Sequence, residues 1–251
     1  MVKMRKLQLV LLLTGLAVTL TAPNLFAYTG LDGTLNFAAP TYQNGDGGEF
    51  NAVTTGLGSF ATFCIEAGEF IGQPPSGPYT YTINTGAVQG DAGVDATDPH
   101  TGLPMDNISI GTAWLFSQFS AGTLTLDNGT GSYFDANRLA NAGELQQAIW
   151  FLEDETGGQN NGYVALAETA LGSLQLAQVE ADSNGAYGVV ALNLFDANGN
   201  PAQDQLAVVP EVVATPEPTT AGCFLLGLGL LAGRLTLRLK ISPKTISISR
   251  K

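Results

Sequence analysis

Basic residues are almost absent from the body of this chain. Of its ten Lys and Arg residues, three lie before residue 28 and six after residue 233, so Arg138 is the single basic residue of positions 28–233. Those positions hold all 22 acidic residues, and one positive against 22 negative side chains gives a formal charge of −21. Because phosphate binding depends on Lys and Arg that displace counterions, the sequence excludes a nucleic-acid partner. Such a charge favours solubility and the attraction of cations.

Histidine and recognisable catalytic motifs are also scarce. The single histidine, His100, excludes a zinc site built on two or three histidines. The sequence has neither a G-x-S-x-G nucleophile motif nor a glycine-rich phosphate loop. A glycosidase needs only two carboxylates. Any chain with 22 acidic residues meets this criterion, so it does not help to decide whether the protein is a glycosidase. We therefore expect no enzymatic activity, no cofactor and no metal site, with a secreted glycosidase as the minor alternative.

The two cysteines do not form an obvious pair. Cys64 lies in the acidic body, whereas Cys223 lies in an apolar segment near the C-terminus, where it is a poor disulfide partner. In an exported protein Cys64 is therefore a leftover thiol. Three interpretations stay open: a buried free cysteine that packs as a small hydrophobe, an intermolecular disulfide, and a thiol held in another covalent bond.

The first 27 residues are typical of a secretory signal peptide. Basic residues precede an uncharged apolar run, and Ala27 provides a small residue for cleavage. The run from Leu7 to Leu20 is short for a membrane span, which needs about 20 residues. We predict export through the Sec route with removal of residues 1–27, and an uncleaved N-terminal membrane helix is the alternative.

The C-terminal part of the chain has three sections. Residues 210–218 form a Pro-rich tether, residues 219–240 an apolar segment with a basic flank, and residues 241–251 a short basic tail. Basic residues that follow an apolar run stay on the cytoplasmic side, so we predict a C-terminal membrane helix with the preceding domain outside. The uncharged run from Thr219 to Gly233 is shorter than the usual span of about 20 residues, unless Arg side chains snorkel.

This tail resembles the PEP-CTERM sorting signal of Gram-negative bacteria. Pro216, Glu217 and Pro218 stand at the motif position, a Gly/Leu-rich segment follows, and Arg234 is the first of the basic residues. The resemblance implies at least transient anchoring in the inner membrane and processing by an exosortase, commonly in bacteria that make exopolysaccharide. It also implies a final location in the cell envelope or the extracellular matrix. An ordinary tail anchor is the alternative.

Residues 28–209 have the pattern of one β-rich α+β domain. Short β-prone runs separated by turn-forming residues predict strands at 35–39, 48–56 and 78–83. Asn198-Gly199 between two apolar runs predicts a hairpin. Residues 84–107 have few large apolar side chains, so we expect a long surface loop there. We predict a β-sandwich or a barrel-like body with a small helical part.

Apolar periodicity predicts three helices, at residues 108–119, 141–155 and 162–182. In the second helix, the stripe expected to face the core consists of Leu145, Ala148, Ile149 and Leu152. Asn141 is the candidate N-cap, with Glu144 three positions later as in a capping box.

Two groups of oxygen-bearing side chains are candidate calcium ligands. The first lies in the expected loop, lacks the regular spacing of a calcium loop, and consists of Asp91, Asp95 and Asp98. The second has the alternate spacing that opens a calcium loop but no glutamate at the twelfth position, and consists of Asp196, Asn198 and Asn200. We interpret the second group as turn formers, and calcium binding by the acidic loop stays open.

Three short stretches resemble motifs of bacterial thioester domains, in the same order, within residues 63–155. They are Phe63-Cys64-Ile65-Glu66, the run TAWLFSQF that includes Gln118, and Leu145-Gln146-Gln147-Ala148-Ile149-Trp150. That family carries an aromatic-Cys-Ile-acid strand and a later T-Q-x-A-aliphatic-Trp helix, and Leu145 stands here in place of the threonine. The resemblance implies a β-rich body with a helical part, and an internal thioester between Cys64 and Gln146.

The chemistry of a thioester accounts for these residue types. A thiolate attacks the glutamine carboxamide, ammonia leaves, and a lysine amine or a hydroxyl can later capture the activated acyl group. On a helix Gln146 lies beside Trp150 at the edge of the apolar stripe, whereas Gln147 faces the polar side, so Gln146 is the better partner. Candidate supporting residues, of which the two acids could carry protons, are Glu66, Gln118, Trp150 and Glu153.

Two main functions follow as hypotheses. The first is a surface binding or adhesion protein that couples through Gln146 to an amine-bearing surface. The second is a non-covalent structural protein of an exopolysaccharide matrix, in which Cys64 is simply buried. The partners expected from the sequence are an exosortase-type processing enzyme, the membrane, and either exopolysaccharide or an amine-bearing surface.

Overall fold

The computed structural model describes residues 33–209, apart from residues 46, 90–93, 100, 127, 129 and 173 and the side chains of residues 40 and 41. The chain divides into two units, Met1–Val209 and Pro210–Lys251, and all described residues belong to the first. The predicted signal peptide, tether, apolar segment and basic tail lie outside the described residues. Within the described ranges, none of the helices combines the length and the hydropathy that a membrane span requires.

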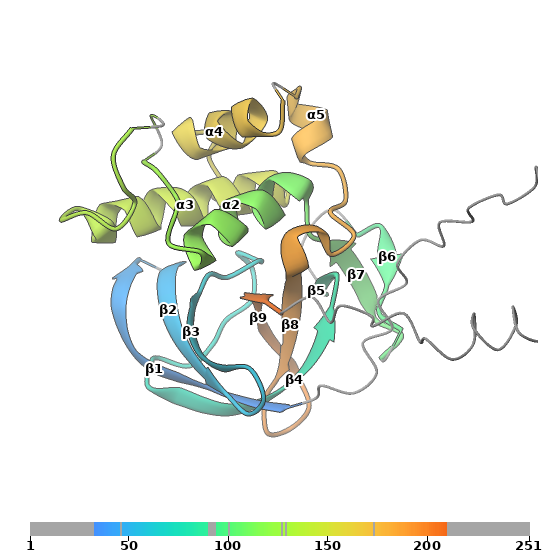
Figure 1. The fold of residues 1–251 in the computed structure, drawn as a ribbon. Helices are drawn as coiled ribbons and strands as arrows, with labels where there is room; N and C mark the ends of the chain where they lie inside the picture. The colour runs from blue at the N-terminus through green and yellow to red at the C-terminus, as the bar shows by residue number, and fades with distance from the viewer. Residues whose placement is uncertain are drawn as a thin grey trace, which may run out of the picture. The chain divides into compact units, whose positions relative to one another are not determined.

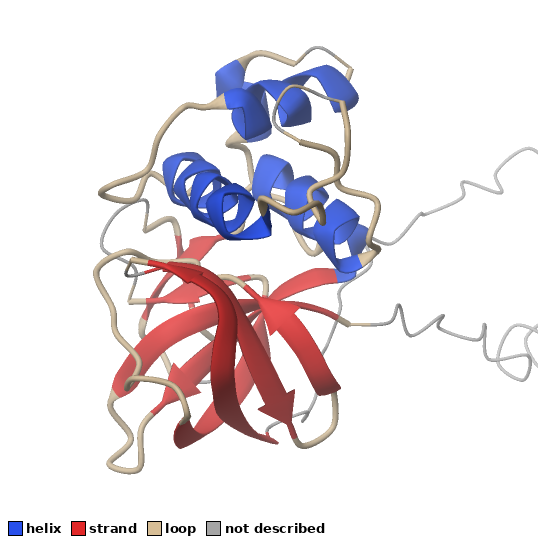
Figure 2. Ribbon diagram, turned by 90° about the vertical axis from the view of Figure 1, so that its left-hand side faces the viewer, coloured by secondary structure: helices blue, strands red, loops and turns tan. Residues whose placement is uncertain are grey.

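A six-stranded antiparallel sheet forms the body of the domain and curls into a half-barrel (Figure 1, Figure 2). In spatial order its strands are β3 (Gly58–Thr62), β2 (Gly47–Thr54), β1 (Gly33–Asn44), β4 (Ser76–Asn84), β8 (Val189–Phe195) and β9 (Pro201–Val208). The strands predicted from the sequence overlap β1, β2 and β4, and the hairpin predicted at Asn198-Gly199 joins β8 to β9. The prediction of a β-rich body is therefore confirmed.

The two edges of this sheet meet just after β3. Cys64 forms an antiparallel bridge with Gln205 of β9, and two backbone hydrogen bonds of 3.0 and 3.1 Å flank the bridge. We call this short pairing of residues 63–65 with residues 204–206 the seam. It joins strands that lie at opposite ends of the sheet order, so it closes the curl at this level.

The seam directs neighbouring side chains into different cores. Phe63 and Ile65 belong to the apolar cluster that includes the helices, whereas Cys64 belongs to the cluster that strand residues such as Leu35 and Phe37 form among themselves. Successive side chains of an extended segment point to opposite faces, which explains this alternation. The thiol therefore lies on the face opposite to its two neighbours.

Helices gather at one end of the half-barrel (Figure 1, Figure 2). Those in the described ranges are α2 (Ile110–Ser120), α3 (Arg138–Leu152), α4 (Gly162–Ala170) and α5 (Leu176–Val179), followed by the 3-10 turn η1 (Ala186–Gly188). The helices predicted at 108–119 and 141–155 are confirmed as α2 and α3. The predicted stripe of α3 is buried, with no residue of it more than 2% exposed.

Two details of the helix predictions are wrong. Helix α3 follows Asn137, one turn earlier than expected, and Asn141 lies inside it, where its side-chain amide donates to the Tyr133 carbonyl at 2.8 Å. The single helix predicted at 162–182 is two short helices, α4 and α5. Gly172 lies between them with a φ of +97°, a left-handed conformation that glycine adopts without strain and that interrupts a helix.

The predicted surface loop at residues 84–107 is also wrong in part. It contains a second antiparallel sheet in the order β5 (Gly86–Val88), β7 (Pro104–Asn107), β6 (Ala96–Thr97). Asp98 is buried there and accepts hydrogen bonds from the Asn84 side chain at 3.1 Å and the Thr101 N–H at 3.0 Å. Backbone pairing and buried polar contacts thus order a segment that has few large apolar side chains.

Asp196 is a turn former, as predicted. Its Oδ1 accepts hydrogen bonds of 2.8 Å from the backbone N–H groups of Asn198 and Asn200. These hydrogen bonds, with those of the Asn200 side chain, hold the pKa of Asp196 below its ordinary value. The alternate spacing of these residues therefore serves the hairpin between β8 and β9.

Candidate functional site

Cys64 lies in the middle of the seam and is fully buried. Gln205 Nε2 donates to its sulfur at 3.4 Å. Burial raises the pKa of the Cys64 thiol to about 12, the Gln205 hydrogen bond acts in the opposite direction, and the charge of Glu66 adds to the rise. In this position the sulfur is a protonated thiol at neutral pH and a weak nucleophile.

The predicted partner, Gln146, contacts the backbone of Cys64. Gln146 lies on the buried face of α3, and its Nε2 donates to the Cys64 carbonyl at 2.8 Å. In return the Cys64 N–H donates to Gln146 Oε1 at 3.2 Å, and the Gly48 N–H on β2 donates to the same oxygen at 3.3 Å. The fold thus brings together two residues that are 82 positions apart in the sequence. The Gln146 carboxamide contacts the backbone of Cys64, while the Cys64 sulfur is hydrogen-bonded to Gln205.

The hydrogen bonds of Gln146 have both a chemical and a structural consequence. Two backbone N–H groups directed at one carbonyl oxygen form the arrangement of an oxyanion hole, which stabilises the charge that develops when a nucleophile attacks the carbonyl carbon. The same contacts satisfy buried backbone groups and connect α3 to β2 and to the seam. The two donors therefore polarise the carboxamide carbonyl, and the three hydrogen bonds together form a structural clasp.

Glycines allow the turn between β1 and β2 to approach α3 this closely. A Cβ atom on Gly47 would lie 2.6 Å from Gln146 Cγ and 2.8 Å from Trp150 Cη2. A Cβ atom on Gly143 of α3 would collide with the side-chain amide of Asn44 at the end of β1. Residues without a side chain at these two positions are thus required for the contact between the carboxamide and the strands.

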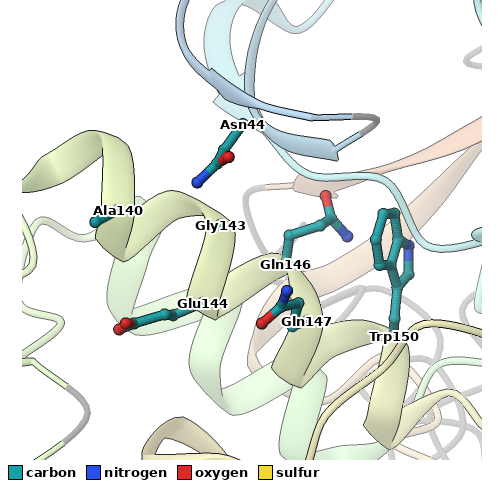
Figure 3. A pocket seen from close by; sticks show the side chains of 7 residues that line it. All are labelled: Asn44, Ala140, Gly143, Glu144, Gln146, Gln147 and Trp150. Carbon is teal, nitrogen blue, oxygen red and sulfur yellow. The ribbon is translucent and has the colours of Figure 1, made fainter.

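An open pocket of about 210 Å³ lies beside Gln146 (Figure 3). It is lined by Asn44, Ala140, Gly143, Glu144, Gln146, Gln147 and Trp150. Figure 3 shows the Gln146 side chain extending from α3 towards the strands, with the ring of Trp150 next to it. The acidic side chain of Glu144 on the pocket wall favours binding of a positively charged ligand. A small amine in this pocket would therefore contact Gln146.

Two of the predicted supporting residues lie near the pair. Trp150 lines the pocket beside Gln146, and Glu66 follows the seam two positions after Cys64. Gln118 lies at the end of α2, where its Oε1 accepts a hydrogen bond of 2.9 Å from the hydroxyl of Thr123. Gln118 thus makes a local contact at its own helix end.

The fourth supporting residue, Glu153, positions the start of α2. Its carboxylate accepts hydrogen bonds from the hydroxyl of Ser109 at 2.7 Å and from the Ser109 N–H at 3.2 Å, and Ser109 is the N-cap of α2. Burial raises the pKa of Glu153 to about 7, while the hydrogen bonds from Ser109 act in the opposite direction. Its hydrogen bonds tie the end of α3 to the beginning of α2, so its contacts are those of a helix anchor.

The single basic residue of the body is fully engaged. Arg138 donates from Nε and Nη2 to the two carboxylate oxygens of Glu49, at 3.0 and 2.6 Å. Its guanidinium carbon lies 4.4 Å from the ring centroid of Tyr42, and the hydroxyl of Tyr133 donates to the same carboxylate at 3.1 Å. The scarcity of basic residues singled out Arg138 in the sequence, but nothing there identified Glu49 as its partner.

Other residues of the site have no sequence signal. Gly48, which donates to Gln146, lies on β2, which pairs with the strand just before Cys64, whereas Gln205, which donates to the sulfur, reaches Cys64 only because the sheet closes on itself. The same closure gathers the carboxylates of Glu66, Glu69 and Asp204 within 4.8 Å of one another. Asp204 is far from the two glutamates in the chain, so no local sequence pattern predicts this carboxylate group.

The predicted sorting signal, Pro216, Glu217, Pro218 and Arg234, lies outside the described residues. A scan against protein-family models and searches of curated proteins and of solved structures found no match. The resemblances to PEP-CTERM proteins and to thioester domains therefore stay predictions from the motifs.

Proposed function

We propose that this protein attaches covalently to an amine-bearing partner at the cell surface or in an exopolysaccharide matrix, through a thioester between Cys64 and Gln146. The observation that carries the proposal is the contact of the Gln146 carboxamide with Cys64 beside an open pocket. Water hydrolyses thioesters, and burial of both residues to 1% exposure or less supports a protected bond.

Formation of the bond requires the Cys64 sulfur to turn from Gln205 towards the Gln146 carbonyl carbon. The sulfur then attacks that carbon, the C–N bond breaks, and the amide nitrogen leaves as ammonia with the proton of the thiol. The N–H groups of Cys64 and Gly48 stabilise the oxyanion of the intermediate. Because burial raises the pKa of the thiol, the sulfur attacks while its proton passes to the leaving amide nitrogen, and no preformed thiolate is needed.

Capture of the partner takes place at the same carbonyl carbon of Gln146, and it breaks the bond to sulfur that the first reaction formed. An amine enters the pocket and attacks the Gln146 carbonyl carbon, and the C–S bond breaks. The proton of the amine returns to the sulfur, so Cys64 regains its thiol and the partner is joined to Gln146 by an amide. The negative charge of the body and of Glu144 attracts lysine ammonium groups, which must lose a proton before they react.

Delivery to the cell surface is part of the proposal. Residues 1–27 direct export through the Sec route, and the tail anchors the protein in the inner membrane until an exosortase processes it. Exchange of Pro216, Glu217 and Pro218 for alanine should block processing of the tail in an exosortase-containing host. Unchanged processing of that variant would favour an ordinary tail anchor.

A non-covalent matrix protein is the second candidate. The hydrogen bond from Gln205 to the Cys64 sulfur favours it, because this bond holds the buried thiol in its present orientation. In that function Gln146 is a structural clasp between α3 and the seam, and Cys64 stays a free thiol.

The intact mass of the purified full chain distinguishes the two candidates. The thioester form is lighter than the sequence by one ammonia and adds one molecule of methylamine on treatment. Cys64→Ala should abolish both signatures, whereas Gln147→Ala, which changes the neighbouring glutamine on the polar side, should retain them. A wild-type chain of unmodified mass, with a thiol that reacts after unfolding, would refute the thioester.

A further inference from the structure

Three carboxylates meet where the chain leaves the seam, apart from the contact between Cys64 and Gln146. Glu66 and Glu69 belong to the segment between β3 and β4, and Asp204 lies on β9. One oxygen of each carboxylate lies within 4.8 Å of the other two. Glu66 and Asp204 are each 1% exposed, and Glu69 is half-buried, so Glu69 is the most accessible of the three residues.

No basic side chain among the described residues balances these charges. Arg138 is the single basic residue of positions 28–233, and it is paired with Glu49. Carboxylates in an apolar interior are costly unless a proton or a cation neutralises them. Consistent with this, burial and the charges of Asp204 and Glu69 raise the pKa of Glu66 well above its ordinary value.

The side chain of Glu66 gives a second, independent indication of a ligand. Its Oε1 is buried and has no hydrogen-bond partner in the described part of the chain, while its Oε2 accepts from the Asp204 N–H at 3.3 Å. Buried carboxylate oxygens in proteins nearly always have a donor or a cation beside them. The orphaned oxygen belongs to one of the three clustered carboxylates, and a cation at the cluster would satisfy it.

Asp204 is held in one orientation for such a role. Its carboxylate accepts hydrogen bonds from the N–H groups of Val88 and Leu194, at 2.7 and 2.8 Å, and from the side chain of Asn193 at 2.6 Å. Burial raises the pKa of Asp204, and these donors act in the opposite direction. A carboxylate fixed by three donors is a preorganised ligand for an ion.

We propose that Glu66, Glu69 and Asp204 bind one divalent cation, and that this cation is Ca²⁺. The three ligands are hard oxygen donors, and the cluster offers no sulfur or nitrogen ligand, which is the preference of Ca²⁺. Two oxygens that each lie about 2.3–2.6 Å from one Ca²⁺ are at most about 5 Å apart, and the cluster meets that limit. Water and backbone carbonyls complete the coordination.

The ion has a structural role in this position. It joins the segment after β3 to β9, so it reinforces the seam that holds Cys64. With three protein carboxylates, the affinity belongs to the range of extracellular calcium modules, with a Kd of about 10⁻⁴–10⁻³ M. The proposal goes beyond covalent attachment and does not depend on it, because the three carboxylates are present whether or not Cys64 is acylated.

Calorimetric titration of the EGTA-treated full chain with CaCl₂ at constant ionic strength tests the site. We expect one Ca²⁺ per chain in the wild type, and an affinity lowered about tenfold or more in Glu69→Gln, which removes the most accessible of the three charges. Asp182→Asn is the matched control, because it removes one charge from an exposed acidic residue beside Asp95 and should bind as the wild type does.

The outcomes separate this proposal from covalent attachment. Cys64→Ala cannot form a thioester and should still bind Ca²⁺ with wild-type affinity, so either proposal can fail alone. Absence of saturable binding to the wild type would overturn the calcium site. An affinity in Glu69→Gln equal to that of the wild type, or an equal loss in Asp182→Asn, would also overturn it, because the effect would then come from the overall charge.

Discussion

Replacement of Gln146 by alanine should remove a large part of the stability of the domain, whether or not a thioester forms. The side chain makes three hydrogen bonds, with the N–H and carbonyl of Cys64 and with the N–H of Gly48. Alanine leaves these three backbone groups without that partner. An unsatisfied buried polar group costs about 1–3 kcal/mol, and the adjacent pocket lets water reach part of the space, so we expect a loss of about 3–5 kcal/mol.

The measurement is best made in a Cys64→Ala background, where no thioester can contribute. Urea unfolding is followed by the fluorescence of the two tryptophans, one of which, Trp150, lies beside Gln146. The matched control is Gln147→Ala in the same background, which should change the free energy of unfolding by no more than about 0.5 kcal/mol. The slope with urea should stay constant if only stability changes.

The total stability of a domain of this kind is about 5–15 kcal/mol, so the predicted loss is readily measured. A loss below about 1 kcal/mol for Gln146→Ala, or equal losses for the two glutamines, would refute the reasoning. It would mean that the hydrogen bonds between α3 and the seam do not hold the domain together.

Three further predictions concern reactivity, pH and packing. In a Cys223→Ser chain without the thioester, the Cys64 thiol should resist a thiol reagent at pH 8 while the protein is folded, because burial raises its pKa to about 12, and should react in urea; rapid reaction of this folded variant would contradict this. Glu153 has a pKa of about 7 in the fold against an ordinary value of 4.5, so the folded state binds more protons than the unfolded chain between these values. Stability should therefore fall as the pH rises from 4.5 to 7, and urea midpoints should show a weaker fall in Glu153→Gln; identical pH profiles would exclude the effect. Gly47→Ala should lower the free energy of unfolding by about 1–3 kcal/mol, because its Cβ would lie 2.6 Å from Gln146 Cγ, and a neutral result would show that α3 can move away from the strands.

Local sequence patterns were sufficient for the elements whose signals are local. Helices α2 and α3 have apolar residues at helical spacing, and the hairpin between β8 and β9 has the Asn198-Gly199 turn. The prediction failed where distant contacts prevail over local preference. Asn141 looks like an N-cap, yet its side chain bonds to the Tyr133 carbonyl, and residues 84–107 look like a loop, yet they pair as strands.

The candidate site divides in the same way. Motifs within short stretches are sufficient to identify Cys64 and Gln146 as candidates, and the helical phase of α3 distinguishes the buried Gln146 from Gln147. The roles of the supporting residues could not be read, because the partner of a polar side chain depends on packing. Glu153 anchors Ser109 at the start of α2, which no spacing within its own helix indicates.

By itself the sequence determined an acidic body with one basic residue and a Cys64 with no obvious disulfide partner in the chain, and its motifs suggested the Cys64–Gln146 pair. Only the tertiary structure decided that the sheet closes at Cys64. Closure brings Gln205 to the sulfur and Asp204 to Glu66, across 141 and 138 positions of the chain. The reason is that the meeting of two sheet edges depends on the twist accumulated over all six strands, which no short stretch of residues encodes.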